Sequence, residues 1–273
     1  MNTQKNTKKD GLGDRMKAYE NVTRTHLMPR SYTVCRIDGR AFHSYLRGSK
    51  KPFDGGVMSD MDNTAIYLCE NVQNAKLGYV QSDEITILLC DFDTLTTTQF
   101  FDGNIQKMSS VIASMATAKF NQLRFKRSTS EGKSPLWNYD DVKLAEFDCR
   151  VWNVPTQWET VNTFIWRNQD CSRNSVSMVA QANFSHKELQ GKSTTTMHEM
   201  LHQKGVNWAT DFPDGAKNGR LIVKEMYETS LPGGSNCSGQ EPSKVIRSKW
   251  ASKGAWKFTE DMLKLKALIP VYE

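Results

Sequence analysis

Hydrophobic and polar positions divide the first half of the chain into short strands and amphipathic helices. β-Branched and aromatic residues fill 31–37, which predicts a buried strand that stops at the turn dipeptide Asp38-Gly39. Apolar side chains recur at steps of three and four residues over 58–72 and again over 104–123. This spacing predicts one helix in each range.

Two apolar runs, 77–80 and 85–90, flank the polar segment Gln81-Ser82-Asp83-Glu84 and predict a β-hairpin with this segment at its tip. A fourth strand is expected over 144–152. The order strand, helix, strand, strand, helix, strand is the βαββαβ arrangement of the ferredoxin-like fold. The sequence therefore predicts an α+β protein built on such a core.

The chain outside this core is expected to be less regular. We expect a disordered lead at 1–14 and a short helix at 15–28, so that the core spans 15–152. The C-terminal region, 153–273, is expected to be helical at first and then rich in loops. Its helices are predicted at 156–183 and 193–203.

The amino-acid composition indicates the class and compartment of the protein but says little about its activity. Hydrophobic residues make up 38% and charged residues 24% of the 273 residues, as in an ordinary globular protein. No apolar run reaches the roughly 18–20 residues of a membrane span. The six cysteines form no CxxC pair, so we expect no zinc ribbon and a reducing, cytoplasmic setting. The net charge of +6 suits a polyanionic partner, but many unrelated enzymes share it.

Three acidic side chains are candidates for a metal site. Asp38 ends the first predicted strand, and Asp83 and Glu84 lie at the hairpin tip; the two elements are central neighbours in a βαββαβ sheet. Converging carboxylates repel one another unless protons or cations neutralise them. Mg²⁺ fits, because it takes few carboxylates and completes its shell with water and phosphate oxygens. The alternative is a pair of ordinary polar turns.

The backbone that follows Asp38 is a candidate phosphate site. The main-chain amides of Gly39-Arg40-Ala41-Phe42-His43 could wrap a triphosphate in the way that anion-binding nests do. Lys51, on the next loop, could neutralise phosphate oxygens, although a solvated loop lysine is the simpler interpretation.

These residues belong to longer motifs that resemble the tRNA-His guanylyltransferase family. The motifs follow one another in the family's order from about Asp14 to Trp208. They are Arg36-Ile37-Asp38-Gly39-Arg40-Ala41-Phe42-His43 (RLDGRxFH), Lys51-Pro52-Phe53-Asp54 (KPxD), Gln81-Ser82-Asp83-Glu84 (QSDE), Phe147-Asp148-Cys149-Arg150 (FDxR) and Trp166-Arg167-Asn168-Gln169-Asp170-Cys171 (WRxxDC).

The resemblance implies a polymerase-palm-like core that works with two Mg²⁺ ions. Asp38 and Asp83 match the metal-binding aspartates, with the Gly39 carbonyl as a further ligand, and Glu84 is expected to support their geometry. The family activates the 5′-monophosphate of a tRNA and then adds nucleotides in the 3′-to-5′ direction. GTP and ATP are the implied substrates, tRNA the implied partner and a homotetramer the implied assembly.

The implied nucleotide site uses the same part of the chain. The segments 38–43 and Ser82-Asp83 match the family's nucleotide-binding segments, and Lys51 matches a lysine that contacts the triphosphate.

One motif departs from the eukaryotic pattern. Where eukaryotic enzymes that guanylate tRNA-His carry HINNLYN, this chain has Ser172-Arg173-Asn174-Ser175-Val176-Ser177-Met178 and keeps only Asn174. With the segments 15–20 and 185–192, this departure resembles the bacterial and phage-type Thg1-like proteins. That branch implies template-dependent repair of 5′-truncated tRNA, with non-templated guanylylation of tRNA-His as the alternative.

Two features of the sequence fit other functional classes. His198-Glu199-Met200-Leu201-His202 fits HExxH, the zinc-protease signature, but the position of a third ligand holds Trp208. The simpler account is a short surface helix with Ser193 or Thr194 as its N-cap.

The other class is a non-catalytic RNA-binding module, because basic residues beside aromatic rings suit phosphate contact and base stacking. Within an enzyme the same stretches would help to hold tRNA, and the simpler account is a solvated face. The basic residues are Arg124, Lys126, Arg127 and Lys133, and then Lys244, Arg247, Lys249, Lys253 and Lys257 beside Trp250 and Trp256.

Overall fold

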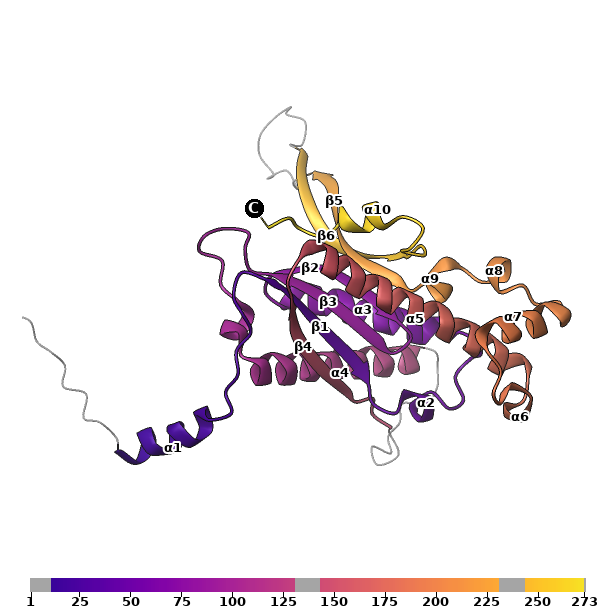
Figure 1. Ribbon diagram of the computed structural model, residues 1–273, viewed down its shortest axis with the longest axis horizontal. Coiled ribbons are helices and arrows are strands. Elements are labelled where there is room, and N and C mark those ends of the chain that lie inside the picture. Colours follow the sequence, from indigo (N-terminus) through magenta and orange to yellow (C-terminus); the bar gives the residue numbers. More distant parts are fainter. Residues whose placement is uncertain (1–10, 131–142, 231–243, 273) are drawn as a thin grey trace, which may run out of the picture.

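The computed structural model describes residues 11–130, 143–230 and 244–272. In these ranges a six-stranded sheet has the order β4-β1-β3-β2-β5-β6, and each neighbouring pair is antiparallel (Figure 1). The strands are β1 (Tyr32–Gly39), β2 (Ala75–Gln81), β3 (Glu84–Cys90), β4 (Phe147–Val154), β5 (Arg220–Ser230) and β6 (Lys244–Gly254).

Long helices cover both faces of this sheet. On one face α3 (Gly55–Asn71) and α4 (Ile105–Ser130) pack over a core that includes Ile37, Met61 and Phe120. On the other face α5 (Gln157–Asn183) and the short α10 (Met262–Lys266) cover a second core. The Thr156 hydroxyl caps α5 by accepting the Glu159 N–H at 3.1 Å, which starts the helix close to the predicted residue 156.

The first four strands with α3 and α4 form the predicted βαββαβ core, and β1 and β3 are its central strands. This arrangement confirms the α+β fold class. β1 runs two residues further than expected and includes Asp38 and Gly39, so that the turn falls at Arg40 and Ala41. The chain is also helical earlier than expected, because α1 spans Gly11–Asn21, beginning within the predicted lead and ending well before residue 28.

The C-terminal region differs most from the prediction. Where loops were expected, β5 and β6 form a long hairpin whose first residues extend the core sheet through pairing with β2. Leu221 and Phe258 join Tyr79 and Phe164 in the second core. The boundary expected at residues 152 and 153 is therefore not a break in the sheet or in the core.

Short helices surround the C-terminal half of α5. A small third core forms there, with Val176 and Val179 of α5 against Leu201. The other short helices of the described ranges are α2 (Phe42–Tyr45), η1 (Phe100–Gly103), α6 (His186–Leu189), α7 (Thr194–Gln203), α8 (Trp208–Asp211) and α9 (Asp214–Lys217). Among the described residues, none of the helices has both the length and the apolar character that crossing a bilayer requires.

Candidate active site

The sheet brings the two predicted metal-binding aspartates together. The register of β1 and β3 sets Asp38 opposite Glu84, and the N–H of Gly39 donates to the main-chain oxygen of Asp83 at 3.1 Å. The tip between β2 and β3 is thus tied to the end of β1. A tip far from β1 would have excluded a shared site. The structure instead places Asp83 next to the end of β1 that carries Asp38.

Burial is the main reason why the pKa of Asp83 is raised, and neighbouring negative charge adds to it. Burial, and then the nearby Asp38 and Glu84 carboxylates, raise this pKa from 3.8 to about 6, although hydrogen bonds from its own N–H and from Ser82 lower it in part. A cation beside Asp83 would offset the repulsion.

The chemistry of the donor set fits magnesium. The described ranges hold no group of three or more His, Cys, Asp or Glu side chains arranged to bind a metal. The candidate donors are the carboxylates of Asp38 and Asp83 and main-chain oxygens such as that of Gly39. This sparse, all-oxygen set is the kind that Mg²⁺ completes with water and phosphate oxygens.

Glu84 faces a buried network instead of solvent. One carboxylate oxygen accepts from Arg167 Nε of α5 at 2.8 Å and from Gln81 Nε2 at 3.0 Å. Arg167 also donates to Asp170 at 2.6 Å. These contacts fasten α5 to the hairpin that carries Asp83, which fits the supporting role expected of Glu84.

The turn after β1 forms a smaller amide cradle than predicted. The N–H groups of Gly39 and Arg40 are already bonded to main-chain oxygens of Asp83 and Glu146. In contrast, the N–H groups of Ala41, Phe42 and His43 donate to no described residue. Phe42 is buried and anchors this turn in the first core, which leaves consecutive amides free to meet an anion.

The side chain of Arg40 does not take part in the cradle. It is 74% exposed and forms an ion pair with Glu146. Its predicted place in the nucleotide site is therefore not supported by its side-chain contacts.

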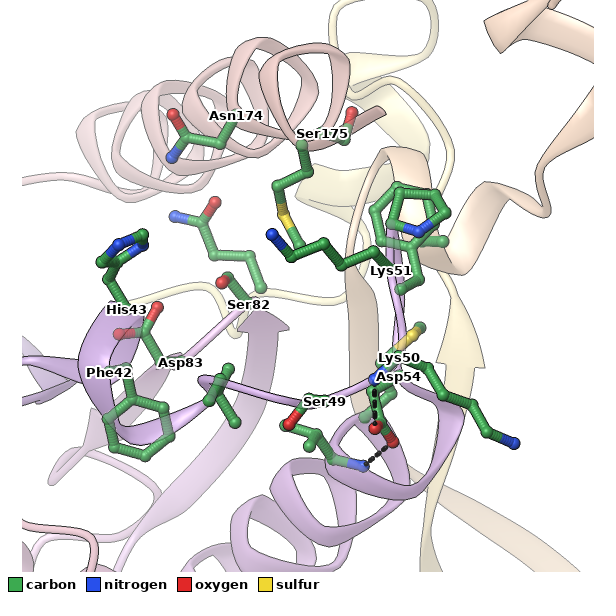
Figure 2. Close-up of a pocket in the computed structure, with 18 of the residues that line it drawn as sticks. Phe42, His43, Ser49, Lys50, Lys51, Asp54, Ser82, Asp83, Asn174 and Ser175 are labelled. Atoms are coloured by element: carbon green, nitrogen blue, oxygen red, sulfur yellow. Dashed lines mark hydrogen bonds between the residues drawn. The ribbon is translucent and has the colours of Figure 1, made fainter. Parts of the chain in front are cut away.

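A cavity of about 530 Å³ is lined by Phe42 and His43 and by Asp83. His43 and Lys51 both line it, as expected, and Figure 2 shows the Lys51 side chain reaching into the cavity while that of Lys50 points away. Asp54 holds this loop, since its carboxylate accepts the N–H groups of Lys50, Gly56 and Val57 at 3.1, 2.9 and 3.1 Å. Burial raises the pKa of Asp54, but these bonds outweigh it and leave the pKa below its usual value.

The far wall of the cavity comes from residues that the motifs did not assign to the site. The departing segment 172–178 contributes Asn174, Ser175 and Met178 from α5. Arg220 of β5 reaches the cavity because it is the cross-strand partner of Val80. No local sequence signal marks Arg220, whose place depends on a strand pairing between distant segments.

A second cavity of about 410 Å³ lies on the α5 side of the same aspartates. It is lined by Asp38 and Asp83, by the half-buried Arg36 and by the buried Arg167. The two cavities share the hairpin tip, so Asp83 lines both of them, whereas Asp38 lines the second.

The protease signature lies away from this site in α7. The helix begins at Ser193, whose hydroxyl accepts the Thr196 N–H at 3.1 Å, as the surface-helix interpretation predicts. The His198 ring packs edge-on against Trp208, with ring centres 5.2 Å apart. Trp208 thus occupies the place where a third zinc ligand would be needed.

Several basic side chains of the two stretches form ion pairs within the protein. Arg124 and Arg127 form ion pairs with the buried Asp60, and Lys133 lies outside the described residues. On β6, Lys244 and Lys253 pair with Glu228 and Glu225. Trp250 is buried, as the simpler account expects.

A βαββαβ sheet with two aspartates at the ends of its central strands is the plan of a palm-type nucleotidyltransferase. The family model described as Thg1, tRNA-His guanylyltransferase, matches residues 13–155, which is more than half of the chain. This chain belongs to that family.

Solved structures and curated relatives agree with the family match. A bacterial tRNA-His guanylyltransferase (Thg1)-like protein in complex with ATP is 40% identical, with a TM-score of 0.80 over 95% of this chain and 99% of that chain. A structure of such a protein with GTP is 39% identical, with a TM-score of 0.74 over the same 95% and 99%. The tRNA(His) guanylyltransferase of Debaryomyces hansenii is 26% identical over 74% of this chain and 77% of its own length.

Proposed function

We propose that this protein repairs 5′-truncated tRNA by adding nucleotides in the 3′-to-5′ direction, each chosen by pairing with the opposite strand. The observation that carries the proposal is that Asp83, next to Asp38 at the end of β1, lines a cavity that also holds Lys51. ATP and GTP are its proposed substrates, in line with the ligands named for the related bacterial structures. A cytoplasmic homotetramer is the assembly that the family resemblance suggests.

Two Mg²⁺ ions would be held by Asp38, Asp83 and the Gly39 carbonyl, and would supply charge neutralisation at the attacking and leaving oxygens of phosphoryl transfer. The chain itself does the positioning. The amides of 41–43 and the Lys51 ammonium hold the triphosphate in one orientation, with His43 beside them. Glu84 and Arg167 keep the hairpin tip rigid while the reacting groups align.

The templated form of the reaction is favoured by two findings. The cavity wall at 172–178 keeps only one residue of the eukaryotic HINNLYN stretch. The identity of 40% to a bacterial Thg1-like protein also exceeds the 26% identity to the Debaryomyces hansenii enzyme. Non-templated guanylylation of tRNA-His is the second candidate.

The deciding experiment offers labelled tRNAs that lack one 5′ nucleotide, with each nucleoside triphosphate in turn. Templated repair predicts that the added base follows the opposite base in every tRNA tested. Addition of guanosine alone, whatever the opposite base, would refute templating. No addition to any tRNA would refute the proposal as a whole.

The metal site is tested by replacing each aspartate with alanine. Asp38→Ala and Asp83→Ala should each abolish nucleotide addition and leave the circular dichroism spectrum unchanged. Asp93→Ala is the matched control, because Asp93 lies outside the site in a partly exposed pair with Lys76. Substantial activity in both site variants would refute the assigned role.

A further inference from the structure

The tryptophan of the WRxxDC motif, Trp166, is only half buried. It lies on α5 and is 48% exposed. Its ring contacts two cations, since the guanidinium carbons of Arg167 and Arg36 lie 4.3 and 5.6 Å from the ring centre. Both arginines line the second cavity, together with Asp38 and Asp83. A large aromatic ring is therefore left partly in solvent against two residues of that cavity.

The helical repeat of α5 places Trp166 at one end of the second cavity. The α5 residues Asp170, Asn174, Ser177 and Gln181 line this cavity and recur at steps of three and four, so they form one row along the helix. Trp166 precedes Asp170 by four residues and continues the row by one turn, about 6 Å along the helix axis. The row that lines the cavity thus ends in a half-exposed aromatic ring.

The second cavity suits a sugar–phosphate chain. Apart from Met178, every residue that lines it is charged or polar. Arg36 precedes Asp38 by two residues, and its only ion pair with a described residue joins its Nε to Glu84 over 3.8 Å. Because this contact is long, the charge of Arg36 remains available to a phosphate of a nucleic-acid backbone.

Nucleotide transfer brings two substrates to the same pair of aspartates. The triphosphate is proposed to lie in the nucleotide cavity, which is the one that Lys51 and Asp83 line. The second cavity is lined by Asp83 and also by Asp38. It therefore offers the 5′ end of a tRNA a separate approach to the metal-binding residues.

We infer that the 5′ end of the tRNA enters the second cavity and that its terminal base stacks on the Trp166 ring. The last base of a 5′-truncated strand has one face without a neighbour in its own strand. Stacking on an aromatic ring accepts any base, because every base has a π face. Such a contact suits an enzyme whose RNA end changes with each added nucleotide. The inference rests on the proposed tRNA repair and names where the RNA end binds.

The first test compares equilibrium binding of a 5′-truncated tRNA by variants of Trp166. We expect Trp166→Ala to bind about tenfold more weakly than the native protein, as for the loss of one base–aromatic stack, and Trp166→Phe to keep most of the affinity. Trp158→Ala is the matched control, because Trp158 lies on the same helix, is 45% exposed and has its ring beside Lys266. Unchanged binding by Trp166→Ala, or an equal loss in Trp158→Ala, would overturn the inference.

The second test separates stacking from a purely structural role, in which Trp166 would only cover the ion pair of Arg167 with Glu84. The truncated tRNA is prepared with an abasic 5′-terminal nucleotide, which keeps the phosphate and sugar but lacks the base. The native protein should bind this tRNA about tenfold more weakly than the intact one, whereas Trp166→Ala should bind both equally. An abasic effect of the same size in both proteins would overturn the inference.

Binding and repair have separate readouts in these tests. If nucleotides are added to truncated tRNA but the effects of Trp166→Ala and of the abasic change are independent, the inference about Trp166 fails and the proposed function stands. If the two effects are coupled but no tRNA is extended, the proposed function fails and the stacking contact stands.

Discussion

Position 39 requires a glycine, because an aromatic ring lies where a β carbon would be. A β carbon at this position would lie 2.2 Å from Cδ2 of Phe42. Phe42 cannot move aside easily, because its ring packs against Phe120 and Phe147 with centre distances of 5.6 and 5.1 Å. The glycine therefore lets β1 turn past the ring and deliver the free amides of 41–43 to the cavity.

Gly39→Ala should destabilise the protein by about 1–3 kcal/mol, the usual cost of forcing extra volume into a packed core, and should strongly reduce nucleotide addition. Urea unfolding measures the first effect and the tRNA assay the second. Gly55→Ala is the matched control, since a β carbon there meets nothing within 4 Å. A fully active and stable Gly39→Ala protein would show that the Phe42 ring yields.

The raised pKa of Asp83 predicts a pH-dependent gain in stability on removal of its charge. The folded protein holds this proton up to about pH 6, whereas the unfolded chain releases it near 3.8. Protonation of Asp83 thus favours the fold at low pH, and this contribution is lost as the pH rises through 6. Without metal, Asp83→Asn should be more stable than the native protein at pH 8, by on the order of 1–3 kcal/mol.

The difference in stability between Asp83→Asn and the native protein should shrink towards zero at pH 4, where Asp83 and its asparagine replacement are both neutral in the folded protein. Thermal unfolding in a chelating buffer at the two pH values measures it. Added Mg²⁺ should raise the melting temperature of the native protein more than that of the variant. A variant that is less stable at pH 8 would contradict the crowding of charge around Asp83.

At the residue scale, the sequence predicted the part of the site that lies within the βαββαβ core. Asp38 and Asp83 could be placed together because the βαββαβ order makes their strands neighbours. The role of Arg40 stays a prediction, since its motif position did not reveal that its side chain pairs with Glu146. Arg220 was missed because its position depends on a pairing between residues far apart in the sequence.

Between elements, α3 and α4 are joined by a buried cluster of ion pairs. Asp60 is 1% exposed, and its carboxylate accepts from Arg127 at 2.6 Å and from Arg124 at 3.2 Å. From the sequence alone, these arginines were expected on a solvated face or, within an enzyme, in contact with tRNA. A charge pattern does not show which residues find a buried partner.

Asp60→Ala should destabilise the protein by about 2–4 kcal/mol, because it leaves the two arginines without their shared buried carboxylate. Asp93→Ala should cost less than about 1 kcal/mol, as expected for a partly exposed ion pair. Urea unfolding of the two variants checks the contrast. Equal effects would mean that the Asp60 cluster adds little to the packing of α3 on α4.

The hydrophobic pattern of the sequence did not predict the two strands of the β5–β6 hairpin. Both strands carry many charged and small residues, including Lys224, Glu225, Ser248 and Lys249, which have little preference for strands. Their conformation is fixed by pairing with one another and, at residues 220–222, with β2. In contrast, β2 and β3 of the core are mostly apolar and almost entirely buried.

Across the whole molecule, the remaining exposed charge of β6 is the best candidate for a tRNA-binding surface. Arg247 forms no ion pair with a described residue, and Lys249 lies 5.6 Å above the Tyr227 ring. Arg247→Glu with Lys249→Glu should flatten the dependence of tRNA affinity on salt. The slope should fall by about one for each phosphate that the variant no longer neutralises. The affinity for free nucleotide should stay unchanged.

Filter binding of tRNA over a series of salt concentrations measures the slope. An unchanged slope would remove β6 from the tRNA-binding surface and leave the hairpin with its part in the sheet.

The pairing of β5 with β2 also sets an order of events during synthesis. A ribosome that has not yet delivered residues 220–222 holds a chain in which one wall of the nucleotide cavity is missing. Asp38 and Asp83 emerge early, but the cavity beside Asp83 closes only after β5 has followed. A nascent or prematurely terminated polypeptide would therefore expose the acidic pair without capturing a nucleotide, and enzyme activity would be confined to copies that extend beyond this strand.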